Sequence, residues 1–257
     1  MDKLNNIVLL IQHYLADYIL IILLLGGGVI FTIRLGFIQI RGFKAGWKRT
    51  FGGLLSKKGT AGKDGMSSFQ ALATAIAAQV GTGNIAGAAT ALAIGGPGAI
   101  FWMWIAAFLG MATIFGEAIM AQKYKHVGKD GHVTGGPVYY IQAAFKGTFG
   151  KILAAVFSVL IIFALGFMGN AVQSNSIASA FHTAFGIPQI VVGIIIAAIA
   201  LFVFVGGISR IAKVTETIVP IMACFYIIGS LIVIFANFKE IPYAFYSIVV
   251  GAFKPSA

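Results

Sequence analysis

Charged side chains are scarce in this sequence, and acidic ones are the scarcest. Of the 257 residues, 7 are aspartate or glutamate and 18 are lysine or arginine, so charged residues make up 10%. Soluble proteins carry about 25%. The rest of the chain is strongly apolar, with a mean hydropathy of +0.96. This balance excludes an ordinary soluble domain and predicts an integral membrane protein.

Cysteine is nearly absent, and so is any alternation of polar and apolar residues. The single cysteine, Cys224, lies in an apolar stretch, so no disulfide forms within the chain. The strands of outer-membrane barrels alternate in polarity, whereas stretches such as residues 190–196 are continuously apolar. The sequence therefore predicts an all-α membrane protein.

The apolar intervals fix the expected number of spans. Residues 18–33, 65–116, 152–209 and 217–238 contain no charged side chain, and a spanning helix needs roughly 20 mostly apolar residues. The two long intervals each hold two spans and the two short ones hold one. Six transmembrane helices are predicted, at about 16–33, 66–94, 99–121, 151–181, 188–205 and 214–236. Residues 237–257 are expected to form an outer loop without a closing helix.

The net charge of +11 gives an orientation rather than a nucleic-acid partner. Fifteen of the 18 basic residues fall in three loops that six spans place on one side, and two of these loops are 34–65 and 122–150. Cytoplasmic loops carry the excess of lysine and arginine. We therefore expect a multi-pass protein of the cell (inner) membrane with its amino terminus outside. Its surroundings are the lipid bilayer, and no nucleic acid is expected.

A glycine-rich polar segment interrupts the longest uncharged interval. It reads Gln79-Val80-Gly81-Thr82-Gly83-Asn84-Ile85-Ala86-Gly87. Backbone freed from helical hydrogen bonding is tolerated at bilayer depth only where it is buried in protein or lines a cavity. The second span is therefore predicted to unwind near Gly81–Gly83 and to form a binding site there.

Two other interpretations of this segment were weighed. It formally matches the dinucleotide pattern G-x-G-x-x-G/A, but that pattern requires a preceding strand and an acidic residue about 20 positions later, whereas here the preceding residues are helical in character and the next acid is Glu117. Gly83 and Gly87 also form a small-xxx-small helix-packing motif. Packing explains both glycines but not the polar side chains of Gln79, Thr82 and Asn84, so a ligand site is favoured over packing.

An unwound helix offers the groups that a small zwitterion requires. The N–H groups near Asn84 to Gly87 direct a positive dipole at a carboxylate, and the carbonyls near Ala78 to Gly81 suit a sodium ion or an ammonium group. Polar residues of the fourth span form the expected second wall. Asn170, Gln173 and Ser174 share one helix face, with Asn175 partly turned away; interhelical hydrogen bonding is the alternative.

Several uncommon motifs occur in one order along residues 66–180, and this order closely resembles the sodium:alanine/glycine symporter family. The motifs are the segment Gln79 to Gly87, then Gly95-Gly96-Pro97-Gly98-Ala99-Ile100-Phe101-Trp102-Met103-Trp104, Gly110-Met111-Ala112-Thr113, Gly135-Gly136-Pro137-Val138-Tyr139-Tyr140-Ile141 and Asn170-Ala171-Val172-Gln173-Ser174-Asn175-Ser176.

The resemblance implies the inverted-repeat, broken-helix amino-acid transporter fold with one leading helix, and cotransport of alanine or glycine with sodium. Sodium is the coupling ion, and neither a cofactor nor another metal is expected. The expected substrate-binding residues are Thr82, Gly83, Asn84 and Gln173, with Val80, Gly81 and Asn84 for the cation and Gln79, Gly87, Asn170 and Asn175 in support.

Family members are longer than this chain, so the resemblance implies that residues 1–257 form one membrane domain, the leading helix and first repeat. The second repeat would be absent, and function would need the missing carboxyl-terminal half. Alternatives are a truncated, non-transporting fragment and a membrane-embedded channel or enzyme. An enzyme is not expected, because the 65–116 interval has no acid, base or nucleophile at bilayer depth.

Overall fold

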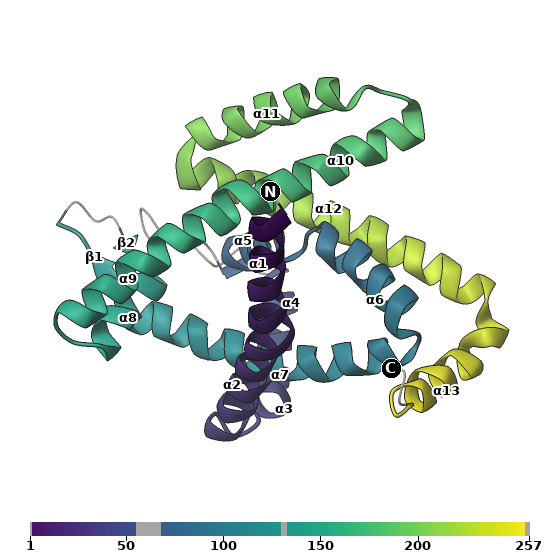
Figure 1. The fold of residues 1–257 in the computed structure, drawn as a ribbon, viewed down its shortest axis with the longest axis horizontal. Helices are drawn as coiled ribbons and strands as arrows, with labels where there is room; N and C mark the ends of the chain where they lie inside the picture. Colours follow the sequence, from purple (N-terminus) through teal and green to yellow (C-terminus); the bar gives the residue numbers. More distant parts are fainter. Residues whose placement is uncertain (1, 55–67, 130–132, 255–257) are drawn as a thin grey trace.

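The computed structural model describes residues 2–54, 68–129 and 133–254, and this part is almost entirely helical (Figure 1). The first half contains α1 Asp2–Gln12, the π-helical η1 His13–Leu20, α2 Ile21–Arg34, α3 Ile38–Arg41, α4 Phe43–Leu54, α5 Ser68–Gln79, the π-helical η2 Gly83–Gly87, α6 Ala88–Gly95 and α7 Gly98–Lys123. The second half contains α8 Pro137–Ala144, α9 Thr148–Ile161, the π-helical η3 Ile162–Gly169, α10 Asn170–Phe185, α11 Gln189–Val205, α12 Gly207–Ala236, the short 3-10 helix η4 Phe238–Glu240 and α13 Ile241–Gly251.

Four helical stretches are long and apolar enough to cross a membrane: Asn5–Arg34, Gly98–Lys123, Thr148–Phe185 and Gly207–Ala236. Two shorter apolar helices, Gly83–Gly95 and Gln189–Val205, accompany them. The prediction of an all-α membrane protein is confirmed at this level, whereas six spans and the inverted-repeat fold stay predictions.

The accessible surface is far larger than that of a soluble protein of the same mass. It measures 19827 Å², whereas a soluble monomer of 27.1 kDa exposes about 11,000 Å². Large apolar side chains, among them Leu23, Phe202 and Phe225, are more than 65% exposed. Such a surface suits lipid or further protein rather than water.

The first helix begins earlier than predicted. The predicted span 16–33 lies within a helix that runs without interruption from α1 through η1 and α2, from Asp2 to Arg34. Residues 7–11 are Ile-Val-Leu-Leu-Ile, which extend the apolar surface by more than a turn. The carboxylate of Asp17 therefore lies in mid-helix, where its Oδ2 is 2.7 Å from Nδ1 of His13.

The helix predicted over 66–94 is interrupted near the predicted break, although residues 66 and 67 of that prediction lie outside the described residues and its role as a membrane span stays a prediction. Helix α5 ends at Gln79, the chain leaves helical geometry at Val80 and Gly81, and η2 and α6 continue to Gly95. Gly96 then turns the chain into α7 with φ +68°, a left-handed conformation that glycine adopts without strain.

The prediction of an outer loop without a helix over residues 237–257 is wrong. Helix α13 occupies Ile241–Gly251 and packs against α7, with proline in its first turn, where its missing N–H costs nothing. The indole Nε1 of Trp102 donates to the carbonyl of Ala252 at 3.1 Å. Eleven residues are too few for a span, so hydropathy alone does not reveal this helix.

The predicted cytoplasmic loops also contain structure. Helices α3 and α4 occupy the described part of 34–65, and α8 lies in 122–150. Strands β1 His126–Val127 and β2 Val133–Thr134 pair antiparallel, with Val127 opposite Val133. The sequence predicted neither strand, because two residues are too short for a periodic pattern to register.

Small residues allow the closest helix contacts. At the crossing of α2 and α7, a Cβ placed on Gly28 would lie 2.8 Å from Cβ of Leu109, and one on Gly116 would lie 2.6 Å from the ring of Phe31. Ala112 between them is fully buried. Such contacts are typical of helices packed within a membrane. Helix α7 also packs against α6 and α13, so it contacts the second half of the broken helix.

Candidate functional site

The break in the second span exposes two backbone N–H groups, and side-chain amides bind both. The last helical bond of the first half runs from the N–H of Val80 to the carbonyl of Ile76, at 2.8 Å. The N–H of Gly81 donates to Oδ1 of Asn84 at 2.9 Å, and the N–H of Asn84 returns to the carbonyl of Gly81 at 3.1 Å. Asn84 thus lies in the first turn of the second half-helix and accepts from the backbone N–H three residues before it, as the N3 side chain of a capping box does.

The second of these N–H groups is bound from another helix. The N–H of Thr82 donates to Oε1 of Gln173, in α10, at 3.0 Å. A carboxamide oxygen is a good acceptor for an orphaned backbone donor. This one hydrogen bond joins two segments separated by 91 positions along the chain.

Glycine at position 81 makes room for this contact. A Cβ built on Gly81 would overlap the amide nitrogen of Gln173 and would lie 3.2 Å from its Cδ and 3.3 Å from its Oε1. The φ of Gly81 is not positive, so the backbone conformation itself does not require glycine. The close approach of the Gln173 carboxamide therefore explains this glycine.

The break also frees carbonyl oxygens at the end of α5. In a regular helix the N–H groups of Gly81 and Thr82 would donate to the carbonyls of Ala77 and Ala78. Both N–H groups are bound to side-chain oxygens instead, so these carbonyls lose their helical partners. The end of α5 therefore presents the negative pole of its dipole and unpaired oxygens, which favour a cation.

The glycines of the packing interpretation face open space. A Cβ added to Gly83 or Gly87 would meet no atom of the described residues within 4 Å. Both glycines lie in the π-helical turn η2, and π-helical turns often occur at functional sites. Close helix packing therefore does not account for Gly83 and Gly87 in the described part of the chain.

Only one of the polar residues predicted on the fourth span reaches the break. Nδ2 of Asn170 donates to the carbonyl of Gly166 in its own helix at 2.9 Å. The hydroxyl of Ser174 likewise donates to the carbonyl of Asn170, at 2.7 Å. The side chain of Asn175 is exposed and makes no hydrogen bond to any described residue. The structure brings Gln173 together with Gly81, Thr82 and Asn84.

The two halves of the broken helix pack against different partners. Helix α5 packs against α12, where Nε2 of Gln70 donates to Oε2 of Glu216 at 2.9 Å and the hydroxyls of Thr74 and Thr215 lie 3.1 Å apart. Helix α6 packs against α7 instead. The sequence analysis missed the seam between α5 and α12. Its signal is the four-residue spacing of Gln70 and Thr74, which places both on one helix face.

Comparison with known proteins supports the resemblance noted from the sequence. The model of the sodium:alanine symporter family matches residues 1–257. The sodium/alanine symporter AgcS of Methanococcus maripaludis is 45% identical over 240 residues, which cover 93% of this chain and 52% of AgcS. The putative sodium/proton-dependent alanine carrier protein YrbD of Bacillus subtilis is 46% identical over 222 residues, which cover 86% of this chain and 44% of YrbD.

A third relative carries a different substrate in its name. The probable sodium/glutamine symporter GlnT of Bacillus subtilis is 42% identical over 250 residues, covering 97% of this chain and 51% of GlnT. The chain spans about half the length of the curated relatives it matches. The family match runs over residues 1–257, so it does not support the expectation of a missing carboxyl-terminal half. This match, together with relatives more than 40% identical, shows that the chain belongs to the sodium:alanine symporter family.

Proposed function

We propose that this chain takes part in sodium-coupled uptake of a small neutral amino acid, alanine or glycine, by alternating access. The observation that carries the proposal is the pair of backbone N–H groups at the break, on Gly81 and Thr82, each bound to a carboxamide oxygen. Family membership and the names of AgcS and YrbD support sodium and alanine. The name of GlnT extends the substrate class to a larger neutral amino acid.

The substrate carboxylate exchanges with the two carboxamides. Oδ1 of Asn84 and Oε1 of Gln173 occupy N–H groups that a carboxylate, with two oxygens and a full negative charge, binds more strongly. When the carboxylate displaces the side chains of Asn84 and Gln173 from these N–H groups, both carboxamides remain free to form hydrogen bonds to the bound substrate. Thr82 and Gly83 complete the substrate site, with Gln79, Gly87, Asn170 and Asn175 in support.

The cation binds on the opposite side of the break. The freed carbonyls of Ala77 and Ala78, together with Val80, Gly81 and Asn84, offer oxygens without a negative charge. Neutral oxygen ligands hold a monovalent ion weakly enough to release it, which a coupling ion requires. Sodium and the substrate carboxylate then stabilise each other across the break, and each binds better when the other is present.

The different neighbours of α5 and α6 make the break a hinge. Helix α5 moves with α12, and α6 moves with α7, so rotation of one pair against the other opens the site to one side or the other. In this arrangement the chain forms one membrane domain of the inner membrane with six spans and an external amino terminus. The basic loops then face the cytoplasm.

Replacement of Asn84 tests the proposal. Asn84→Ala removes the acceptor for the Gly81 N–H and one ligand of both substrate and cation, so sodium-dependent alanine uptake should be lost. Uptake is measured in vesicles that hold the 257-residue chain, with a sodium gradient against a choline control and with protein quantified by immunoblot. Unimpaired uptake by Asn84→Ala would remove this residue from the site. Unitary currents without sodium-coupled uptake would identify a channel instead.

A further inference from the structure

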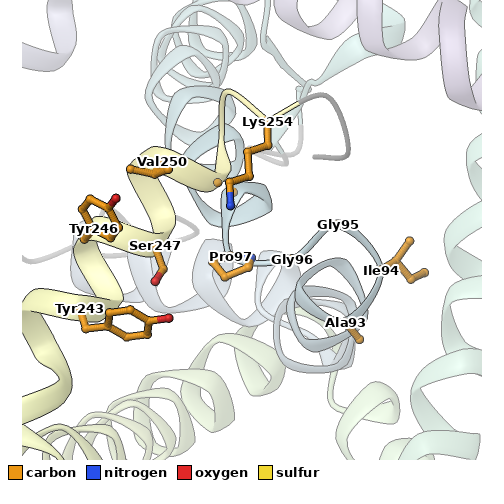
Figure 2. A pocket seen from close by; sticks show the side chains of 12 residues that line it. Ala93, Ile94, Gly95, Gly96, Pro97, Tyr243, Tyr246, Ser247, Val250 and Lys254 are labelled. Atoms are coloured by element: carbon orange, nitrogen blue, oxygen red, sulfur yellow. The ribbon is translucent and has the colours of Figure 1, made fainter.

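A cavity lies at the end of α6 away from the break, between the end of α6, the turn into α7 and the helix α13. It has a volume of about 560 Å³. One wall is formed by residues 93–98, and the other by α13 together with Lys254 (Figure 2). None of these residues belongs to the proposed transport site, so what this cavity binds is a separate question.

The polar side chains of this cavity can donate hydrogen bonds and have no partner among the described residues. Tyr243, Tyr246 and Ser247 contribute hydroxyls, and Lys254 contributes an ammonium group. None of these four side chains forms a hydrogen bond or an ion pair with a described residue. In Figure 2 the side chains of Tyr243 and Lys254 point toward the turn at Pro97, that of Ser247 points toward Tyr243, and the hydroxyl of Tyr246 points away.

The positive charge of the cavity lining favours an anion as ligand. Its lining contains one lysine and no aspartate or glutamate, so the net charge of the lining is positive. The two hydroxyls of Tyr243 and Ser247, together with the one ammonium group, suit an oxyanion with several acceptor oxygens, such as a phosphate. The remaining lining is apolar and includes Ala93, Ile94 and Val250. The cavity therefore matches a phosphate that is attached to apolar material.

The surroundings of α13 are typical of a membrane interface. Trp102 is 50% exposed and Phe253 is 68% exposed, and their ring centroids lie 6.3 Å apart. Trp104 and Phe245 form a second exposed pair. Tryptophan and tyrosine gather at the level of lipid headgroups, where a lysine attracts anionic lipids. Helix α13 itself carries Tyr243, Phe245 and Tyr246, and with 11 residues it is too short to cross a bilayer and suits a position along the interface.

We propose that this cavity binds a phosphate group, with the headgroup of an anionic phospholipid as its source. Lys254 pairs with the phosphate charge, and the hydroxyls of Ser247 and Tyr243 donate to its oxygens. The apolar wall of α6 accepts the glycerol and the upper acyl chain. Because α13 also packs on α7, a lipid held here rigidifies the outer end of the broken helix. This inference is independent of the proposed transport function.

Native mass spectrometry of the 257-residue chain titrated with phosphatidylglycerol tests the proposal. Lys254→Gln should weaken lipid binding about fivefold, the contribution of one lysine near an anionic surface, and Lys254→Arg should retain it. Lys239→Gln is the matched control, because Lys239 lies in η4, outside the cavity. Lys254 is exposed, so its replacement leaves the packing intact. Ser247→Ala should weaken binding by a smaller factor.

Competition separates the two sources of phosphate. If inorganic phosphate at millimolar concentration displaces phosphatidylglycerol from wild type but no longer affects Lys254→Gln, the cavity accepts free phosphate as well. If it has no effect while Lys254→Gln still lowers lipid binding, the lipid is the ligand. Unchanged phosphatidylglycerol binding by Lys254→Gln, or an equal loss in Lys239→Gln, would overturn the proposal.

Discussion

The contact between Gly81 and Gln173 makes a sharp prediction about the substrate site. Gly81→Ala places a methyl group where the carboxamide of Gln173 now lies, with Cδ at 3.2 Å and an overlap with the amide nitrogen. Because the φ of Gly81 is not positive, alanine suits the backbone, and the side chain of Gln173 must move instead. That movement breaks the 3.0 Å hydrogen bond to the N–H of Thr82.

The magnitude follows from one neutral hydrogen bond, the one that the displaced carboxamide of Gln173 makes to the bound substrate in the proposed site. Such a bond contributes about 1 kcal/mol, which corresponds to about a fivefold change in a dissociation constant. Gln173→Ala removes the same bond and should weaken sodium-dependent alanine binding by the same factor, about fivefold. If Gly81→Ala acts only through Gln173, the double variant should also lose about fivefold, rather than the roughly 25-fold expected of independent effects.

Equilibrium binding of radiolabelled alanine, in sodium chloride against choline chloride, measures the four proteins of this double-mutant cycle. Gly193→Ala is the matched control, because a Cβ there meets no described atom within 4 Å, and its dissociation constant should equal that of wild type. Additive losses in the double variant would show that Gly81 acts independently of Gln173. Unchanged affinity in Gln173→Ala would assign Gln173 to helix packing.

Two further predictions concern α7. Gly116→Ala should destabilise the protein by about 1–3 kcal/mol, because its Cβ would lie 2.6 Å from the Phe31 ring. Gly110→Ala is the control, because a Cβ there meets no described atom within 4 Å, and it should leave the stability unchanged. Equal shifts of the two variants in thermal unfolding would contradict the packing of α2 on α7. Trp102→Phe removes the indole donor to the Ala252 carbonyl and should speed amide hydrogen exchange in α13, whereas unchanged exchange would show that this bond does not hold the helix.

The broken helix could be predicted from the sequence because its signals are local. Glycines and uncharged polar residues inside an uncharged interval indicate a break, and the structure leaves helical geometry at Val80 and Gly81, whereas Thr82 and Gly83 of the predicted Gly81–Gly83 are helical. The partner of the break is a different matter. The helical period places Asn170 and Gln173 on one face, but it does not tell which of the two side chains contacts another helix. Gln173 accepts a hydrogen bond from Thr82, whereas Asn170 donates within its own helix.

The elements that the sequence analysis missed are those that hydropathy does not mark. Helix α13 is too short to read as a span and carries Pro242 in its first turn, so its residues resembled a loop. The early start of the first helix was missed because Asn5, Asn6 and His13 dilute the apolar signal. The seam of Gln70 with Glu216 joins residues 146 positions apart, which no local pattern reveals.

Amide hydrogen exchange at residues 79–88 tests the central claim, that the break is the shared site for substrate and sodium. The measurement compares the chain with alanine and sodium together, with each alone, and with neither. A substrate carboxylate bound to the N–H groups of Gly81 and Thr82 should slow their exchange more than the carboxamides of Asn84 and Gln173 do in the empty site. Alanine and sodium together should protect these N–H groups more than either does alone. Exchange at the break that is the same in all four conditions, while alanine still binds, would contradict the claim.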